Sequence, residues 1–335
     1  MLSSFTPLCA LFFVGINVAS VAFGANTSLN IILTNDDNWA SANIRATYSA
    51  LTAAGHNVIL SAPVVQNSGQ GGRFILPTTN ITIPDEFGIL QAGAPYYGQD
   101  PNNNRIWYMN GTPAAAVSTL YSVIRPIILG DNSSIDLVVA GPNEGHNLGG
   151  FYYTLSGTMG ATVDAIYRER SSTCADAAGQ LPAIAVSAGN GTHHSYLTLT
   201  NDTNDPANLA ARLTTSFVNA LASTKMSGQP LLPLGTGASI NLPMFGRGLI
   251  AQMCERGAAA VHPHAPNRRR RRAGARHRLK RLPQRDTNRS GRPLTHCSLS
   301  ATDGVNVNYT GSRILPGETG VTAGRQSSVS FFSID

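Results

Sequence analysis

The stretch NIILTNDDN, residues 30–38, places an apolar run directly before two adjacent aspartates, Asp36 and Asp37. Residues 31–33 are apolar without alternation, which is typical of a strand covered on both faces of a parallel sheet. Two adjacent carboxylates at a strand end repel each other, and burying both without a cation is costly. The stretch therefore predicts a buried strand ending at a metal site, unless Asp37 or Asn38 only caps the following helix. Mg²⁺ or Mn²⁺ is the expected ion, because both favour carboxylate oxygen.

Other parts of the chain repeat this pattern and alternate it with helical patterns. Uninterrupted apolar runs occur at residues 58–60, 137–139 and 183–186. Helical spacing begins after Ser41, after Thr112 with Pro113 at the first position, and after Gly157. This order predicts an α/β fold of three αβα layers, with a Rossmann-like, doubly wound, mostly parallel sheet. In such a sheet the ligand site lies beyond the carboxyl ends of the strands.

Polar, glycine-rich segments stand where those strands end. The segment QNSGQGGR, residues 66–73, allows backbone N–H groups to approach an anion and adds the hydroxyl of Ser68. The segment GPNEGHNLGG, residues 141–150, supplies two amide side chains, and the helix starts at residues 110–113 and 155–158 favour anions. Together these segments predict a metal–phosphate site. His146 is a candidate general acid, although a lone loop histidine is more often a hydrogen-bonded bystander.

The excess of positive charge is confined to one block. The chain carries 24 Lys and Arg against 18 Asp and Glu, but residues 256–292 hold thirteen of those bases and one acid. The block has no strand alternation and no helical stripe, so we expect residues 254–299 to be disordered, as an insert or an artefact of the gene model. No nucleic-acid-binding module accompanies it, so no nucleic-acid partner is expected. A polyanion-binding insert is the alternative.

The N-terminus predicts secretion. An apolar run over residues 8–22 leads into Ala22-Phe23-Gly24, which is typical of a signal peptide, residues 1–24, cleaved before Ala25. An extracellular glycoprotein is expected, and the acceptor sequons begin at Asn26, Asn80, Asn110, Asn132, Asn190, Asn201, Asn288 and Asn308. No later apolar run is long enough to span a bilayer, so no membrane partner is expected. Cys174 and Cys254 are the plausible disulfide pair, which leaves Cys297 over.

Six motifs, taken together, resemble one family. The strings ILTNDD, NSGQGG, NGTPAAAV, DLVVAGPNEGHNLG, LSGTMGA and PAIAVS, in this order and spacing, resemble the SurE survival-protein family of metal-dependent phosphatases. The resemblance covers about residues 29–245, and INLP at residues 240–243 also resembles a family strand. It implies one domain, residues 25–253, to which residues 300–335 belong as a C-terminal remnant. The chain departs from the family pattern at Asn38, where glycine is usual, and at Gly72-Arg73, where bacterial members often place histidine.

The resemblance also implies an activity and a site. The activity would be that of an acid phosphatase or 5′/3′-nucleotidase that hydrolyses small phosphomonoesters such as nucleoside monophosphates with Mg²⁺ or Mn²⁺. Asp36 or Asp37 would orient or deprotonate the attacking water. The metal ligands implied are Asp36, Asp37, Ser68 and Asn143. The phosphate pocket implied consists of Asn110, Thr112, Asn147, Ser156, Gly157 and Thr158. Family members commonly form dimers or tetramers, so a homodimer or homotetramer is expected.

Two other functions are consistent with the sequence. A secreted binding protein that has lost activity with its disrupted C-terminal region would bind nucleotide or metal without turnover. A polyanion-binding module built on the Arg-rich block would be retained on heparin or nucleic acid in a salt-dependent manner.

Overall fold

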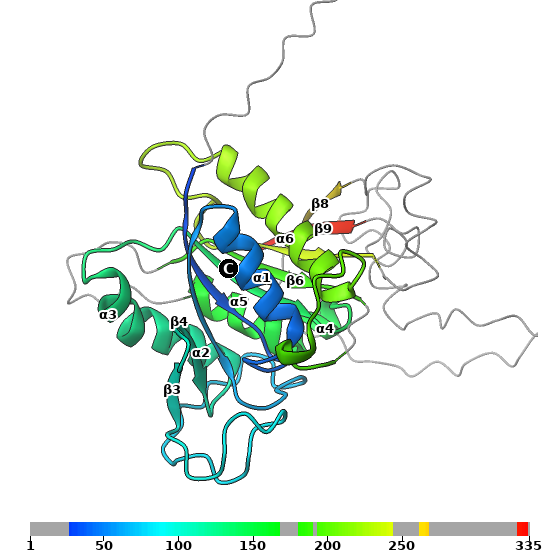
Figure 1. The fold of residues 1–335 in the computed structure, drawn as a ribbon. Helices are drawn as coiled ribbons and strands as arrows, with labels where there is room; N and C mark the ends of the chain where they lie inside the picture. The colour runs from blue at the N-terminus through cyan, green and yellow to red at the C-terminus, as the bar shows by residue number, and fades with distance from the viewer. Residues whose placement is uncertain (1–26, 168–179, 190–192, 244–260, 268–326, 334–335) are drawn as a thin grey trace, which may run out of the picture.

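The protein is built around one sheet with helices on both faces (Figure 1). The computed structural model describes residues 27–167, 180–189, 193–243, 261–267 and 327–333. The strands are β1 (Asn30–Thr34), β2 (Asn57–Pro63), β3 (Tyr97–Asp100), β4 (Asn103–Met109), β5 (Leu137–Asn143), β6 (Ala183–Ser187), β7 (Thr236–Asn241), β8 (Val261–Asn267) and β9 (Ser327–Ser333). The helices are α1 (Ala42–Ala53), α2 (Pro113–Thr119), the π-helix η1 (Leu120–Ile124), α3 (Arg125–Leu129), α4 (Gly149–Leu155), α5 (Gly157–Tyr167), the 3₁₀ helix η2 (Tyr196–Thr198) and α6 (Pro206–Ser223).

The strand order is β3-β4-β2-β1-β5-β6-β7-β9-β8. The strands from β4 to β7 in this order run parallel, whereas β3 is antiparallel to β4 and β9 is antiparallel to β7. From β1 the chain adds β2 and then β4 on one side, and from β5 it adds β6 and then β7 on the other. The direction of winding therefore reverses between β1 and β5, which places the expected ligand site at their carboxyl ends.

Two hydrophobic cores fill the space between the sheet and its helices. Ile31 and Leu33 of β1 pack into the core that contains Ile44 of α1 and Val218 of α6, whereas Ile32 packs into the opposite core. That second core is lined by α2, η1 and α5. Because consecutive strand residues point to opposite faces, β1 must be apolar at every position to serve both cores. The predicted three-layer, doubly wound fold is confirmed (Figure 1).

The predicted helix starts are correct in position but wrong in their capping contacts. Ser41 and Thr112 are the N-cap residues of α1 and α2, yet neither side chain makes a capping hydrogen bond. Ser41 Oγ accepts instead from the amide of Asn35 (3.3 Å), and Thr112 Oγ1 accepts from the N–H of Ile75 (3.0 Å). Both hydroxyls therefore tie loops of the ligand edge together. The helix after Thr112 is also not continuous, because a π-helical turn separates α2 from α3.

The edges of the sheet differ from the sequence prediction. Strands β3 and β9 have no uninterrupted apolar run of three or more residues; β3, for example, is YGQD. Within residues 254–299, which the sequence predicts to be disordered, Val261–Asn267 forms β8 by pairing with β9. Strand β9 brings residues 327–333 into the same sheet through its pairing with β7.

Among the described helices, none combines the length and the apolar character that crossing a bilayer requires. The predicted signal peptide and both cysteines of the predicted disulfide lie outside the described residues.

Candidate metal and phosphate site

Asp36 lies at the carboxyl end of β1 and is 1% exposed. Its Oδ1 accepts a 2.5 Å hydrogen bond from the hydroxyl of Thr158, in the first turn of α5. Burial raises the pKa of Asp36, and the hydrogen bonds from Thr158 and the neighbouring backbone oppose that rise. Burial makes this carboxyl hard to ionise. A cation beside it would stabilise the ionised form.

Asp37 is fully buried and is held from two sides. Its Oδ1 accepts from the side-chain amide of Gln66 (3.0 Å), and its Oδ2 accepts from the backbone N–H of Glu144 (2.9 Å). Burial raises the pKa of Asp37 well above its ordinary value, and the negative charges of Asp36 and Glu144 raise it further. The predicted repulsion between the paired carboxylates is therefore present in the folded protein.

Asn143 is the third predicted metal ligand, after Asp36 and Asp37. It ends β5, beside β1, and its Nδ2 donates to the carbonyl of Gly145 (2.9 Å). Its Oδ1 is buried and has no hydrogen-bond partner among the described residues. An unsatisfied buried amide oxygen beside two buried carboxylates fits a hard divalent cation, which takes oxygen ligands. In the described part of the chain, no group of three or more His, Cys, Asp or Glu side chains is placed to hold a metal.

The start of α5 packs directly against Asp36. A Cβ atom at Gly157 would lie 2.8 Å from Cβ and 2.9 Å from Oδ2 of Asp36, so only glycine allows this approach. Ser156 is buried, and its Oγ accepts from the N–H of Met159 (3.2 Å), which caps the helix. The predicted residues Ser156, Gly157 and Thr158 therefore bring a helix N-terminus to the carboxylates, where its N–H groups favour an anion.

The segment after β2 packs against the same face of α5 as Asp36, because a Cβ atom at Gly157 would also lie 3.0 Å from the carbonyl oxygen of Asn67. A Cβ atom at Gly160 would lie 1.9 Å from the carbonyl oxygen of Gly71, so the Gly-rich turn and α5 are in backbone contact. Ser68 is exposed, and its N–H donates to Oε1 of Gln66 (2.9 Å), the residue whose amide binds Asp37. The structure thus brings Ser68 to the same edge as the aspartates, two hydrogen bonds away from Asp37.

Asn147 is buried in a polar cluster that joins three strands. Its Nδ2 donates to Ser187 Oγ (2.9 Å), and its N–H donates to Asn241 Oδ1 (2.9 Å). Ser187 ends β6 and Asn241 ends β7. Asn147 is a predicted site residue, whereas Ser187 and Asn241 are not, although each ends an apolar strand. These two residues hold the loop after β5 in place.

His146 is not a free general acid. Its Nε2 lies 2.6 Å from the carbonyl oxygen of Leu242, and its ring fills the space in which a Cβ of Gly189 would lie. Burial lowers the pKa of His146, and the contact with Leu242 opposes that shift. His146 therefore ties the loop after β5 to the residue that follows β7.

Asn110 and Thr112 stand at the end of β4, beyond β2. The N–H of Asn110 donates to the carbonyl of Tyr96 (2.7 Å), and no hydrogen bond of its side chain occurs among the described residues. Thr112 is buried and exchanges hydrogen bonds with the backbone of Ile75. Both lie at the carboxyl edge of the sheet, two strands away from β1.

Asn38 stands where the SurE pattern usually has glycine, and its side chain makes two hydrogen bonds that hold the turn. Its φ is 158°, close to extended backbone. Its Oδ1 accepts from the N–H of Ala40 (2.7 Å), and its Nδ2 donates to the carbonyl of Val64 (2.7 Å). The turn after the aspartates therefore forms with asparagine.

Glu144, Glu86 and His193 form a charged bridge beside the site. His193 Nδ1 lies 2.9 Å from Glu144 Oε2, and its Nε2 lies 2.6 Å from Glu86 Oε1. Burial lowers the pKa of His193, but the charges and hydrogen bonds of Glu144 and Glu86 outweigh it, so the net pKa is raised. The bridge leaves no signal in the sequence, because its members are far apart in the chain.

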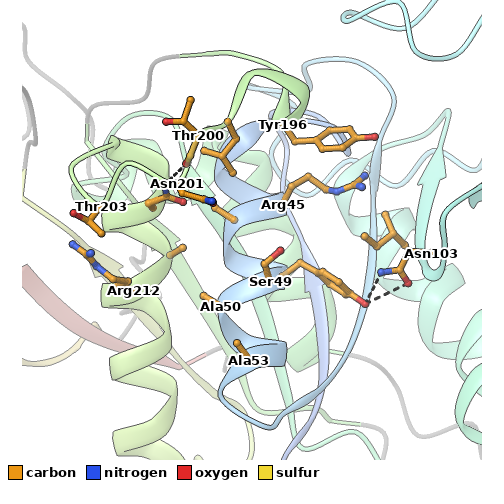
Figure 2. Close-up of a pocket in the computed structure, with 16 residues that line it drawn as sticks. Arg45, Ser49, Ala50, Ala53, Asn103, Tyr196, Thr200, Asn201, Thr203 and Arg212 are labelled. Atoms are coloured by element: carbon orange, nitrogen blue, oxygen red, sulfur yellow. Dashed lines mark hydrogen bonds between the residues drawn. The ribbon is translucent and has the colours of Figure 1, made fainter.

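A separate cavity of about 580 Å³ lies along the outer side of α1 (Figure 2). In it the guanidinium of Arg45 stands 3.8 Å from the ring centre of Tyr196 and pairs with Asp100 at 2.6 Å. The residues that line the cavity include no carboxylate, and the cavity includes none of the predicted site residues. It is therefore distinct from the site at the ends of β1 and β5.

A doubly wound sheet with buried aspartates, an unsatisfied amide oxygen and a helix N-terminus at its switch point defines an α/β protein with a candidate site for a metal ion and an anion. The family model for Survival protein SurE matches residues 31–263. The chain belongs to the SurE family.

Individual relatives agree with this assignment. An acid phosphatase from Yarrowia lipolytica is 42% identical over 222 residues, which is 66% of this chain and 58% of that protein. A 5′-nucleotidase SurE from Desulfovibrio desulfuricans is 30% identical over 194 residues, 57% of this chain and 62% of the relative. The matches thus span about three fifths of these two relatives. A SurE protein from Aquifex aeolicus has the same fold, with a TM-score of 0.52 at 20% identity, over 91% of this chain and 94% of that one.

Proposed function

We propose that this chain is a phosphomonoester hydrolase that depends on a divalent metal, and that it acts as an acid phosphatase or nucleotidase on small phosphate esters such as nucleoside monophosphates. The observation that supports it most directly is the contact between α5 and Asp36. Thr158 and Gly157 hold an anion-favouring helix N-terminus against one member of a buried carboxylate pair. Such a pair suits a cation, and the helix start suits a phosphate bound to that cation.

Mg²⁺ or Mn²⁺ is the proposed metal, with Asp36, Asp37, Asn143 and Ser68 as the residues that would hold it. The ion would polarise the phosphoryl oxygens and lower the pKa of a water. The chain's own residues keep the carboxylates in position: Thr158 binds Asp36, while Gln66 and the Glu144 backbone bind Asp37. Fixed carboxylates orient or deprotonate the attacking water, and backbone N–H groups at the start of α5 stabilise the charge on the phosphoryl group.

The location and assembly are proposals of the same kind. The N-terminal sequence supports secretion after cleavage before Ala25, and the exposed sequons at Asn80, Asn132 and Asn201 support glycosylation. Asn110, half-buried beside the phosphate pocket, is the sequon that we expect to stay unmodified. A homodimer or homotetramer is the proposed assembly. No nucleic-acid or membrane partner is proposed.

The test is phosphate release from a nucleoside monophosphate and from an aryl phosphate, with Mg²⁺, Mn²⁺ or EDTA. We expect turnover with metal, no turnover with EDTA, and loss of turnover in Asp36→Ala. Asp131→Ala is the matched control, because Asp131 is exposed and lies in the turn after α3, away from the ligand edge. Circular dichroism establishes that each variant is folded. Folded wild-type protein that binds nucleotide without turnover would favour the inactive binding protein instead.

The polyanion-binding alternative is tested separately. Deleting residues 268–292 leaves β8 intact and removes the arginine run. Salt-dependent heparin binding that disappears with the deletion, while wild-type protein lacks turnover, would favour that alternative.

A further inference from the structure

Helix α4 presents large apolar side chains to solvent. Phe151 is 64% exposed, Tyr152 42% and Leu155 40%. Their spacing places Leu155 on the same face as the other two, because residues three and four apart are neighbours on a helix. The rings of Phe151 and Tyr152 meet edge to face at 5.7 Å. Tyr153 points the other way, into the core, where its ring lies 6.0 Å from that of Phe332.

Both ends of α4 belong to the candidate site. Asn147 lies two residues before the helix, and Ser156, which caps α5, follows directly after it. The carbonyl of Leu155 accepts a 2.8 Å hydrogen bond from the N–H of Gly71. That contact fixes the end of α4 against the Gly-rich turn that carries Ser68. The exposed face of α4 is therefore anchored at the edge of the phosphate pocket rather than on a remote surface.

The composition of α4 limits what can bind there. Its sequence, GGFYYTL, has no charged residue, so the helix offers a ring-rich, apolar surface. A phosphomonoester whose phosphate lies at the aspartates must extend its alcohol away from them. An alcohol with a flat aromatic ring gains by covering exposed aromatic side chains, whereas a small polar alcohol does not.

We propose that Phe151, Tyr152 and Leu155 form the binding subsite for the alcohol portion of the substrate, and that they select phosphate esters carrying a flat ring. This inference rests on the proposed phosphatase function. It adds residues that contact the part of the substrate remote from the phosphate, so their contribution appears in KM more than in kcat.

The experiment compares three substrates: a nucleoside monophosphate, an aryl phosphate and glycerol phosphate. The proteins are the wild type, the double variant Phe151→Ala/Tyr152→Ala, and Ile127→Ala. Ile127 is the matched control, because it is 67% exposed on α3, outside the predicted site. We expect the double variant to lose about tenfold in kcat/KM for the ring-bearing esters, mainly through KM, and to keep its rate on glycerol phosphate. Ile127→Ala should match the wild type on all three.

Other results overturn the inference. An equal loss on all three substrates would mean that α4 supports the site only structurally, and unchanged kinetics would mean that the alcohol does not contact this face. Sedimentation velocity distinguishes another occupant: if the double variant dissociates a wild-type oligomer and loses rate equally on every substrate, the face binds a second copy of the chain. Failure of the folded wild type on all three substrates would instead reject the proposed function itself.

Discussion

The hydroxyl of Thr158 donates a 2.5 Å hydrogen bond to Oδ1 of Asp36 and joins the first turn of α5 to the end of β1. The two residues are 122 positions apart in the chain, and both are buried. A buried carboxylate that keeps a hydroxyl donor ionises more easily than one without it. This contact therefore fixes the position of the first aspartate and partly opposes the rise in its pKa that burial causes.

Thr158→Val keeps the shape of the side chain and removes the donor. Hydrogen bonds to charged groups contribute about 1.5–3 kcal/mol, so we expect metal affinity and kcat/KM to fall by about tenfold or more. Metal titration followed by calorimetry, together with phosphate release, measures both. Thr158→Ser retains the hydroxyl and should stay close to the wild type. Equal losses in the two variants would mean that packing, not the hydrogen bond, is responsible.

Gly157→Ala should disrupt the site by a steric route. Its Cβ would lie 2.8 Å from Asp36 Cβ and 3.0 Å from the carbonyl oxygen of Asn67, so the carboxylate or the helix must move. Displacement of a catalytic group by about 1 Å costs about a hundredfold in rate, and we expect a loss of that size. Gly150→Ala is the control, because no atom lies within 4 Å of its added Cβ. Unchanged kinetics in Gly157→Ala would contradict the close packing of α5 on Asp36.

The stability of the metal-free protein should depend on pH through Asp37. Its pKa in the folded protein is raised well above the ordinary 3.8, chiefly by burial, so the folded state holds the proton more tightly than the unfolded chain does. This contribution to stability is fully present below the unfolded pKa and is lost as the pH rises through the folded pKa. In that interval stability should fall by up to about 1.4 kcal/mol per pH unit.

Asp37→Asn isolates this effect. The variant cannot ionise at position 37, so its metal-free form should be more stable than the wild type at neutral pH and should depend less on pH. Urea unfolding in EDTA at several pH values measures both quantities. Parallel pH profiles for the two proteins would assign the titration to other groups. With metal present the order should reverse, because the wild type alone keeps both carboxylate ligands.

Arg45 should matter for stability rather than for catalysis. It pairs with Asp100 at 2.6 Å, and the side chain of Asp100 is only 1% exposed. Arg45→Ala leaves that carboxylate buried without its partner, which costs about 3–5 kcal/mol. Lys225→Ala is the comparison, because the Lys225–Asp136 pair is more exposed and should contribute about 1 kcal/mol or less. Urea unfolding of both variants measures the difference, and similar losses would contradict the role of burial.

The central strands and the main site motif could be predicted from the sequence for a local reason. Residues 31–33 must be apolar at every position because β1 contributes to two cores, and that continuous pattern is visible without a structure. The adjacent residues Asp36 and Asp37 and the polar segments at later strand ends were also visible, because each is a contiguous stretch of the sequence. Edge strands such as β3 are covered on fewer sides, so their sequences carry a weaker signal, and β8 was missed because its composition resembles a solvated segment.

By itself, then, the sequence determined the central apolar strands of a doubly wound, mostly parallel sheet, the carboxylate pair at the end of the first strand and the resemblance to SurE proteins. Only the tertiary structure decided how the other side chains meet. Asn147 contacts Asn241 across 94 residues, and His193 bridges Glu86 and Glu144 across 107 residues and 49 residues. Such contacts depend on the right-handed crossovers that bring separate strand ends to one edge of the sheet, and local sequence carries no record of which side chains will then face each other.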